Sequence, residues 1–211
     1  GGTRFVGKKL VDHLIDDEDK QVYVASRRKI QVTNFISFDR KDLDDLNRIF
    51  NQHQFDLVVD FINYSAPDSK KLIDAIRDSG TLPHLLSIST TYVYGNPEQL
   101  EAGNTYHEQD FTAGDYVLTM QDRPNIDYVE GKRSMEAYLT RNYPADKLTV
   151  VRFPIILGED DHTERTYYFR DIILNEKSVR FSGEGKSSNY IFSSEAADAL
   201  YYLVKNSVAG T

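Results

Sequence analysis

The chain of 211 residues carries a formal net charge of -8 at pH 7, with 27% charged and 40% hydrophobic residues. This length supports one substantial core with an appended lobe, and the negative charge disfavours a nucleic-acid partner. The absence of cysteine excludes disulfides and thiolate chemistry and fits a cytoplasmic location, while no apolar run approaches the roughly 18 residues of a membrane span.

A glycine-rich turn opens the sequence GGTRFVGKKLVDHLIDD and leads into a helix, because apolar residues from Leu10 to Ile15 recur at helical spacing. Backbone N–H groups at the start of a helix bind pyrophosphate, and glycines let a phosphate approach the chain closely. Gly1, Gly2 and Gly7 fit that task. The alternative is an ordinary turn without a ligand.

Arg4 stands where such turns usually carry a further glycine. Its side chain fills space that glycine leaves free, yet its guanidinium is itself able to bind a phosphate through two hydrogen bonds. The helix within the turn and the strand-like segment after it favour the phosphate site over a chance cluster of glycines.

Short β-branched and aromatic runs alternate with helical patterns along the rest of the chain. Strands are expected at 21–26, 32–38, 55–62, 84–89 and 147–153, and helices at 42–53, 68–80, 128–142 and 194–205. Gly80 is expected to close the second of these helices. The alternation predicts an α/β fold with a Rossmann-type doubly wound parallel sheet. Such a sheet has a central strand that runs into the glycine turn, so we expect residues upstream of Gly1 and a further strand beyond Thr211.

The segment after the 21–26 strand bears on the choice of dinucleotide. An acidic residue there binds the adenine ribose of NAD, whereas arginine accommodates the 2′-phosphate of NADP. Arg27 and Arg28 occupy this place and favour NADP over NAD, unless they only solvate a loop. Asp39, after the next strand, is a candidate partner for the adenine amine, or else a cap of the following helix.

Tyr128 and Lys132 lie one helical turn apart and share a face. A lysine ammonium beside a tyrosine hydroxyl lowers the pKa of that hydroxyl and makes it a usable general acid or base. Tyr201 and Lys205 have the same spacing, so spacing alone decides little. Only Tyr128 lies between a strand that ends in hydroxyl residues and the segment VVRFPIILG, whereas the helix with Tyr201 is expected to pack.

The segments GGTRFVG, ISTTYVYG, YVEGK, VVRFPIILG and NYIFSSEAADAL occur in this order, and together they resemble the extended short-chain dehydrogenase/reductases of the NAD(P)-dependent epimerase/dehydratase family. The resemblance implies that Tyr128 exchanges a proton with a substrate hydroxyl, that Thr90 orients the substrate oxygen and that Lys132 holds the nicotinamide ribose. It also implies that Pro154 borders the nicotinamide. The residues expected to contact the cofactor are Gly1, Thr3, Arg4, Phe5, Val6, Gly7, Arg27, Asp39, Phe61, Ser89 and Pro154.

The resemblance implies an NAD(P)-binding Rossmann domain at residues 1–158 and part of a substrate lobe, with a returning strand and helix, at residues 159–211. The predicted activity is that of an NAD(P)-dependent epimerase/dehydratase or reductase on a hydroxyl or carbonyl of a small molecule, with a nucleotide sugar as one candidate. The sequence leaves a homodimer open. In the lobe, Tyr167 and Tyr168 either contact substrate or pack against the sheet. No metal site is predicted, because the histidines lack ligand spacing and the acidic residues near position 160 are more typical of helix caps.

Two features leave a rival function open. Arg4 replaces the family's middle glycine, as it does in an atypical branch that includes chloroplast stem-loop-binding proteins, and FDRKD around Asp39 is also similar to that branch. The rival is therefore an NAD(P)-bound binding or regulatory protein that has lost catalysis, with RNA binding included. The intact Thr90, Tyr128 and Lys132 favour an enzyme. A structural domain that binds no nucleotide is the third alternative.

Overall fold

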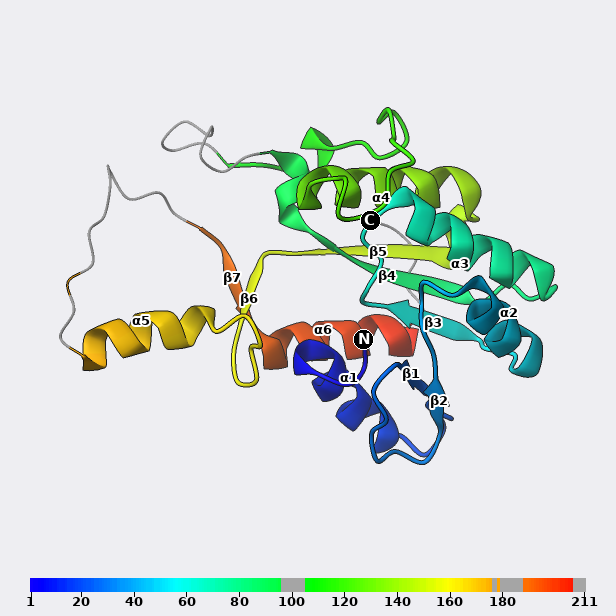
Figure 1. The fold of residues 1–211 in the computed structure, drawn as a ribbon, viewed down its shortest axis with the longest axis horizontal. Helices are drawn as coiled ribbons and strands as arrows, with labels where there is room; N and C mark the ends of the chain where they lie inside the picture. The colour runs from blue at the N-terminus through cyan, green and yellow to red at the C-terminus, as the bar shows by residue number, and fades with distance from the viewer. Residues whose placement is uncertain (96–104, 176–177, 179–187, 207–211) are drawn as a thin grey trace.

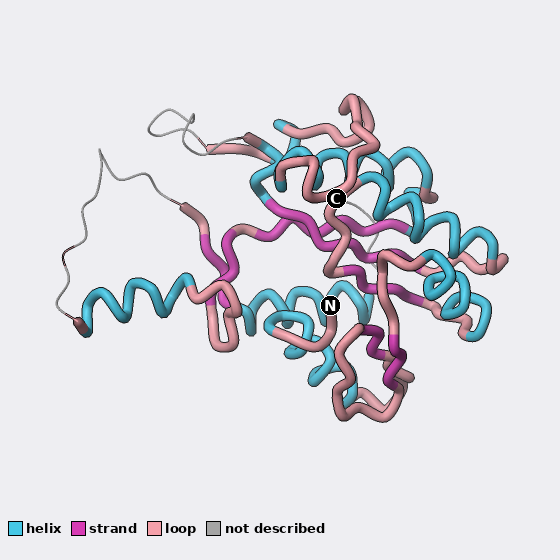
Figure 2. Tube along the Cα trace, in the orientation of Figure 1, coloured by secondary structure: helices cyan, strands magenta, loops and turns pink. Residues whose placement is uncertain are grey.

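The structure, a computed structural model, describes residues 1–95, 105–175, 178 and 188–206. Its helices are α1 (Phe5–Ile15), α2 (Leu43–Gln52), α3 (Ala66–Asp78), α4 (Tyr128–Asn142), α5 (Arg165–Leu174) and α6 (Ser193–Asn206). Its strands are β1 (Val24–Ser26), β2 (Phe35–Ser37), β3 (Leu57–Asp60), β4 (His84–Thr90), β5 (Leu148–Phe153), β6 (Ile155–Leu157) and β7 (Tyr190–Phe192). Short 3-10 helices include η1 (Thr91–Tyr94), η3 (Glu108–Asp110) and η4 (Ala145–Lys147). Figures 1 and 2 show this arrangement.

Every described strand pair is parallel. β3, β4 and β5 form one sheet in this order, while β1 pairs with β2 and β6 with β7. In the three-stranded sheet Asp60 lies opposite Ser87, and Ser89 lies opposite Arg152. Because parallel neighbours end at the same edge, the residues after β3, β4 and β5 are brought together there.

Helices cover both faces of this sheet, as Figure 1 shows. Neighbouring residues of β4 point to opposite faces: Leu85 packs in a core with α2, α3 and α4, and Leu86 packs in a second core with α1 and α6. Both leucines are almost fully buried. Helices on both faces of a parallel sheet confirm the predicted α/β fold with a Rossmann-type doubly wound sheet.

Helix boundaries follow local capping chemistry. The side chains of Asp42, Ser65 and Asp127 accept hydrogen bonds from backbone N–H groups at the starts of α2, α3 and α4. Ser79 is the C-cap of α3, and Gly80 follows it with a φ of +72°. Gly80 thus ends this helix from one position beyond the cap, where the left-handed backbone favours glycine.

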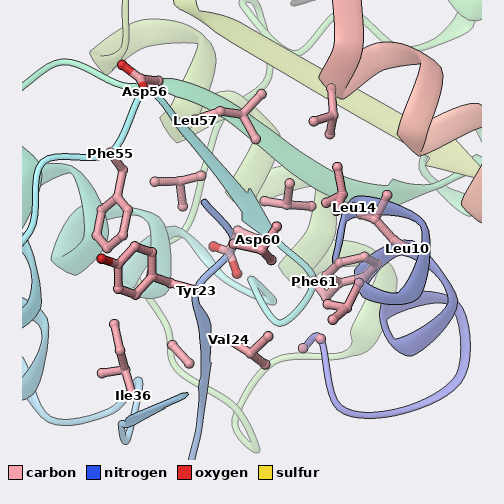
Figure 3. Close-up of a pocket in the computed structure, with 18 of the residues that line it drawn as sticks. Leu10, Leu14, Tyr23, Val24, Ile36, Phe55, Asp56, Leu57, Asp60 and Phe61 are labelled. Atoms are coloured by element: carbon pink, nitrogen blue, oxygen red, sulfur yellow. The ribbon is translucent and has the colours of Figure 1, made fainter. Parts of the chain in front are cut away.

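The strands near the amino end are shorter than their sequence patterns. The 21–26 run forms only β1, and the 32–38 run forms only β2. A cavity of about 500 Å³ lies between β1 and β3, with Leu10 and Leu14 of α1, Val24 of β1 and Leu57 of β3 at its wall (Figure 3).

Helix α6 packs against α1, although nearly the whole described chain separates them. Ala196, Ala197 and Leu200 of α6 are fully buried in this contact. Tyr201 is half-buried there, and its hydroxyl lies 3.3 Å from the carboxylate of Asp17. The second Tyr-x-x-x-Lys pair therefore belongs to a packed helix. The division at residue 158 stays a prediction.

Candidate active site

The residues predicted to bind substrate and cofactor gather at one edge of the sheets. Arg27 follows β1, Asp39 follows β2, Phe61 follows β3, Thr90 ends β4 and Pro154 follows β5. The carboxyl ends of parallel strands are where ligands bind in open α/β sheets. The fold thus places Phe61, Thr90 and Pro154 at one edge of the β3–β4–β5 sheet, while Arg27 and Asp39 follow the strands of the separate β1–β2 pair.

Thr90 and Tyr128 meet through their side chains. Thr90 is 5% exposed at the end of β4, and Tyr128 begins α4 with 39% of its surface exposed. The Thr90 side chain lies near the Tyr128 hydroxyl and favours its ionised form. Burial and the neighbouring Tyr64 nevertheless raise the pKa of Tyr128. Tyr128 is therefore protonated at neutral pH and suited to donate a proton.

Lys132 is buried beneath this pair. It is 2% exposed, and its ammonium donates hydrogen bonds of 2.7 Å to the backbone carbonyls of Asn63 and Ile88. Burial lowers the pKa of Lys132 to about 8, while Asp60 and Glu136 oppose that shift. The sequence expectation that Lys132 lowers the pKa of Tyr128 differs from this structure, because the ammonium is bound to carbonyls and burial raises the tyrosine's pKa.

Tyr64 and Arg123 complete the surroundings of Tyr128, and neither was predicted from the sequence. The Lys132 ammonium lies 4.8 Å from the centre of the Tyr64 ring, and the centres of the Tyr64 and Tyr128 rings are 6.3 Å apart. The guanidinium carbon of Arg123 lies 5.1 Å from the centre of the Tyr64 ring and 5.8 Å from that of Tyr128. Tyr64 follows β3 at the ligand-binding edge, which was a usable signal, whereas Arg123 lies in the polar segment without periodicity.

The glycine turn packs tightly against the start of α1. A Cβ on Gly7 would lie 2.1 Å from the carbonyl oxygen of Gly1, so this close approach requires glycine. Phe5 has a φ of +48°, a conformation that few non-glycine residues adopt. Among the described residues, α1 begins without a side-chain cap: the N-cap Arg4 makes no such bond, and the first turn lacks acidic residues. Its first N–H groups remain available to an anion.

The remaining predicted turn residues lie around this helix start. Thr3 is half-buried, Val6 is 4% exposed in the α1 core, and Phe61 contacts the position of Gly1. Gly2 lies against Val11 of α1. These residues fit a close backbone approach, which is what a bound pyrophosphate requires.

Arg27 and Arg28 are exposed after β1, where the Ser26 hydroxyl donates to the backbone carbonyl of Arg28. The carboxylate of Asp39 accepts a hydrogen bond from the backbone N–H of Lys41 at 3.0 Å. Asp42, rather than Asp39, caps α2. Both arginines are thus accessible to solvent. The helix-capping role considered for Asp39 belongs to Asp42.

A buried ion pair lies next to the glycine turn. Arg40 and Asp60 are 9% and 6% exposed, and their side chains approach to 2.6 Å. Asp60 ends β3, and its carboxylate also accepts a bond from the backbone N–H of Ile62. The ion pair links the loop after β2 to the last residue of β3, next to Phe61.

Ser89, which was predicted to contact the cofactor, forms a hydrogen bond with another side chain. Its hydroxyl donates to the carboxylate of Glu136, which is fully buried on α4 one turn beyond Lys132. The same carboxylate accepts three hydrogen bonds from the guanidinium of Arg152, at 3.2, 3.1 and 2.7 Å. Ser89 thus supports the site from beneath, and the role predicted for its hydroxyl stays a prediction.

A second cavity, of about 860 Å³, lies between β6, β7 and α5. Tyr167 and Tyr168 line it, with 39% and 63% of their surfaces exposed. Asp161 is buried, but its carboxylate binds Thr163 and does not cap α5. Within the described residues no group of three metal-ligating side chains occurs, and no helix there is long and apolar enough to cross a membrane.

The sequence profile of the NAD dependent epimerase/dehydratase family matches residues 1–211. The chain belongs to this family. No curated protein matches the chain significantly. The family assignment agrees with the doubly wound sheet and with the carboxyl-edge location of the candidate site.

Solved structures share the fold of this family member. The UDP-N-acetylglucosamine 4-epimerase from Bacillus cereus is 17% identical, with 100% of this chain and 74% of that chain covered and a TM-score of 0.66. A short-chain dehydrogenase/reductase from Veillonella parvula, in complex with NADP, is 12% identical, with 99% and 86% covered and a TM-score of 0.61. A nucleoside-diphosphate-sugar epimerase from Staphylococcus aureus is 15% identical, with 100% and 70% covered and a TM-score of 0.62.

Proposed function

We propose that the protein is an NAD(P)-dependent epimerase, dehydratase or reductase that acts on a hydroxyl or carbonyl of a small sugar-type substrate. The observation that carries the proposal is the junction of Thr90 and Tyr128 above the buried Lys132. The family supports the reaction class. The names of two neighbours, a UDP-N-acetylglucosamine 4-epimerase and a dTDP-4-dehydrorhamnose reductase, support a sugar-type substrate.

The two hydroxyls divide the work on the substrate oxygen. Tyr128, protonated at neutral pH, donates its proton to a carbonyl oxygen during reduction and takes it back during oxidation. Thr90 holds the same oxygen and keeps it aligned with the tyrosine. The charges of Arg123 and Arg165 favour the transient tyrosinate, because both lower the pKa of Tyr128.

A dinucleotide fits the residues that the chain offers. The uncapped start of α1 and the glycine contact between Gly1 and Gly7 suit a pyrophosphate, which Arg4 would also bind. When bound, the nicotinamide would supply hydride acceptance and return at the substrate carbon. The two other turn residues, Thr3 and Phe5, would line the phosphates, and Pro154 would border the ring.

The preference for NADP over NAD is part of the proposal. Arg27 and Arg28 are exposed after β1, at the place where a 2′-phosphate would be bound. Asp39 would bind the adenine amine. The arrangement is compatible with a monomer and with a homodimer, and the proposed cofactor preference does not depend on which of them forms.

Tyr128→Phe tests the proposal, because it removes the proton-transfer hydroxyl and leaves the ring. We expect dinucleotide affinity to stay within about threefold while turnover of nucleotide-sugar substrates falls by about 10²–10⁴-fold. Tyr201→Phe is the matched control, since Tyr201 has the same spacing to a lysine but packs on α6. It should retain both properties.

Two outcomes would reject the enzyme. Wild-type protein that binds NADP but turns over none of a panel of nucleotide sugars, and instead binds RNA, would support the rival regulatory protein. Protein that binds neither NAD nor NADP in calorimetry would support a structural domain. Equal activity in Tyr128→Phe and wild type would remove Tyr128 from the mechanism.

A further inference from the structure

An exposed arginine lies beside the candidate site. Arg123 precedes α4 and lies over the rings of Tyr64 and Tyr128. Within the described part of the chain, its guanidinium has neither a carboxylate partner nor a hydrogen bond. An exposed arginine is commonly only solvated, so a binding role for Arg123 depends on its position beside Tyr64 and Tyr128.

Ring stacking fixes the guanidinium without using its hydrogen-bond donors. A cation over an aromatic face is held by the ring's electrons, and this contact contributes about 0.5–1 kcal/mol at exposed sites. The five N–H groups of an arginine point outward in its plane, so stacking on Tyr64 leaves them available. The protein thus presents a planar set of donors that matches a carboxylate or a phosphate.

The position of Arg123 sets where a bound anion would lie. Its guanidinium carbon is 5.8 Å from the centre of the Tyr128 ring, whose hydroxyl meets Thr90. An anion held by Arg123 therefore lies within a few bonds of the substrate oxygen that Tyr128 contacts. Arg165, at the start of α5, adds positive charge near the same tyrosine, since it lowers the pKa of Tyr128 against the effect of burial.

Nearby carboxylates are already engaged elsewhere. Asp127 caps α4 through the N–H groups of Val129 and Glu130, and the Glu130 carboxylate accepts the hydroxyl of Tyr116. Neither one forms an ion pair with Arg123 in the described residues. The Arg123 guanidinium therefore stands without an ion-pair partner there, while Asp122 beside it and Asp127 keep their negative charge.

We propose that Arg123 determines specificity by binding an acidic group on the substrate itself, a carboxylate or a phosphate close to the reacting carbon. This inference rests on the proposed function, because Tyr128 defines the reacting carbon. It differs from recognition of a nucleotide's diphosphate, which would leave no preference between neutral and acidic sugars. The substrate class is thus an acidic sugar or a sugar phosphate.

Two pairs of probes test the proposal by calorimetry on protein saturated with NADP. UDP-glucuronate and UDP-glucose differ by a sugar carboxylate, and glucose 6-phosphate and glucose differ by a phosphate. We expect wild type to bind the acidic member of at least one pair about tenfold more tightly, which corresponds to one charge-assisted contact. The pair that shows the preference distinguishes a carboxylate from a phosphate.

Arg123→Gln should abolish that preference and leave the affinity for UDP-glucose unchanged. Arg123→Lys should restore part of it. Arg77→Gln is the control, because Arg77 is an exposed arginine in the last turn of α3, at the opposite edge of the sheet. Melting temperatures of all three variants should match wild type within a few degrees, which separates lost binding from lost folding.

Several results would overturn the proposal. They are equal binding of both members of both pairs by wild type, an unchanged preference in Arg123→Gln, and an equal loss of UDP-glucose and UDP-glucuronate, which would assign Arg123 to the diphosphate. The proposed function fails separately, through loss of dinucleotide binding or through full turnover by Tyr128→Phe.

Discussion

Arg152 of β5 and Glu136 of α4 form a buried ion pair directly beneath the candidate site. Their side chains are 6% and 0% exposed. The guanidinium also lies over the rings of Tyr94 and Phe111, and its N–H groups reach the Phe111 carbonyl at 3.4 Å. One arginine therefore links the strand, the helix and the loop after η3.

Removal of one member of this pair should destabilise the fold strongly. Glu136→Ala leaves the Arg152 charge buried without a partner, and we expect a loss of about 3–5 kcal/mol in the free energy of unfolding. The double variant Glu136→Leu with Arg152→Met should lose less than Glu136→Ala. Urea denaturation measures both values.

The matched control for that prediction is an exposed pair. Lys8 and Asp12 on α1 approach to 2.6 Å, with about half of each side chain exposed. Asp12→Ala should change the free energy of unfolding by less than about 1 kcal/mol. A loss in Glu136→Ala no greater than this would show that the buried pair contributes little.

Gly7→Ala should disrupt the glycine turn, because the added Cβ would lie 2.1 Å from the Gly1 carbonyl oxygen. We expect NADP affinity to fall at least about tenfold and stability to fall by about 1–3 kcal/mol. Gly114→Ala is the control, since nothing lies within 4 Å of its added Cβ. Equal NADP affinity in the two variants would contradict a phosphate site at this turn.

Arg27→Asp should weaken NADP binding much more than NAD binding, because a charge-assisted phosphate contact becomes a repulsion. Titration of both dinucleotides against wild type and variant measures the change in preference. Arg77→Asp makes the same charge change at the opposite edge and should alter neither affinity. Tighter NAD than NADP binding by wild type would rule out the assigned preference.

The buried Lys132 should make stability depend on pH. Its folded pKa of about 8 lies below the unfolded value of about 10.5, so the unfolded chain holds the proton more tightly. Below pH 8 the buried charge costs up to about 3 kcal/mol, and this cost fades as the pH rises from 8 to 10.5. The stability of wild type relative to Lys132→Met should therefore increase over that range.

Thermal denaturation at pH 7, 8, 9 and 10 checks this sign. The comparison with Lys132→Met cancels the titration of groups common to both proteins. A difference in melting temperature that stays constant from pH 7 to pH 10 would mean that Lys132 has an ordinary pKa in the folded protein.

The sequence predicts α1, α2, α3, α4, α6 and the strands up to β5 in their chain order, because each depends on a local period, whereas α5, β6 and β7 were given no bounds. The 42–53 pattern, for example, matches α2 within a residue at each end. Strand lengths near the amino end are overestimated. β-propensity in 21–26 reflects suitability for a sheet, whereas the length of β1 depends on how far its partner β2 runs alongside it.

The candidate site likewise contains some residues that local spacing predicts and others that only the tertiary structure brings together. Tyr128 and Lys132 share a helix face, so their spacing places them together. Arg123 reaches Tyr64 only through the path of an irregular segment, and no period encodes that path. Glu136 lies one turn after Lys132 and was accessible to the same reasoning, but its partner Arg152 comes from another strand and required the tertiary structure.

Because α1 packs against α6, the cores on the two faces of the sheet are expected to form at different times during folding. The core with α2, α3 and α4 uses residues from Leu46 to Val150, whereas the core with α1 and α6 extends from Val6 to Val204. During synthesis, the core with α2, α3 and α4 has all its residues once Val150 has emerged from the ribosome, while the other core still lacks α6. Contacts between distant segments also form slowly, since a long loop must close first. We therefore expect one side to assemble during synthesis, with the apolar stripe of α1 left for chaperones to shield until α6 emerges.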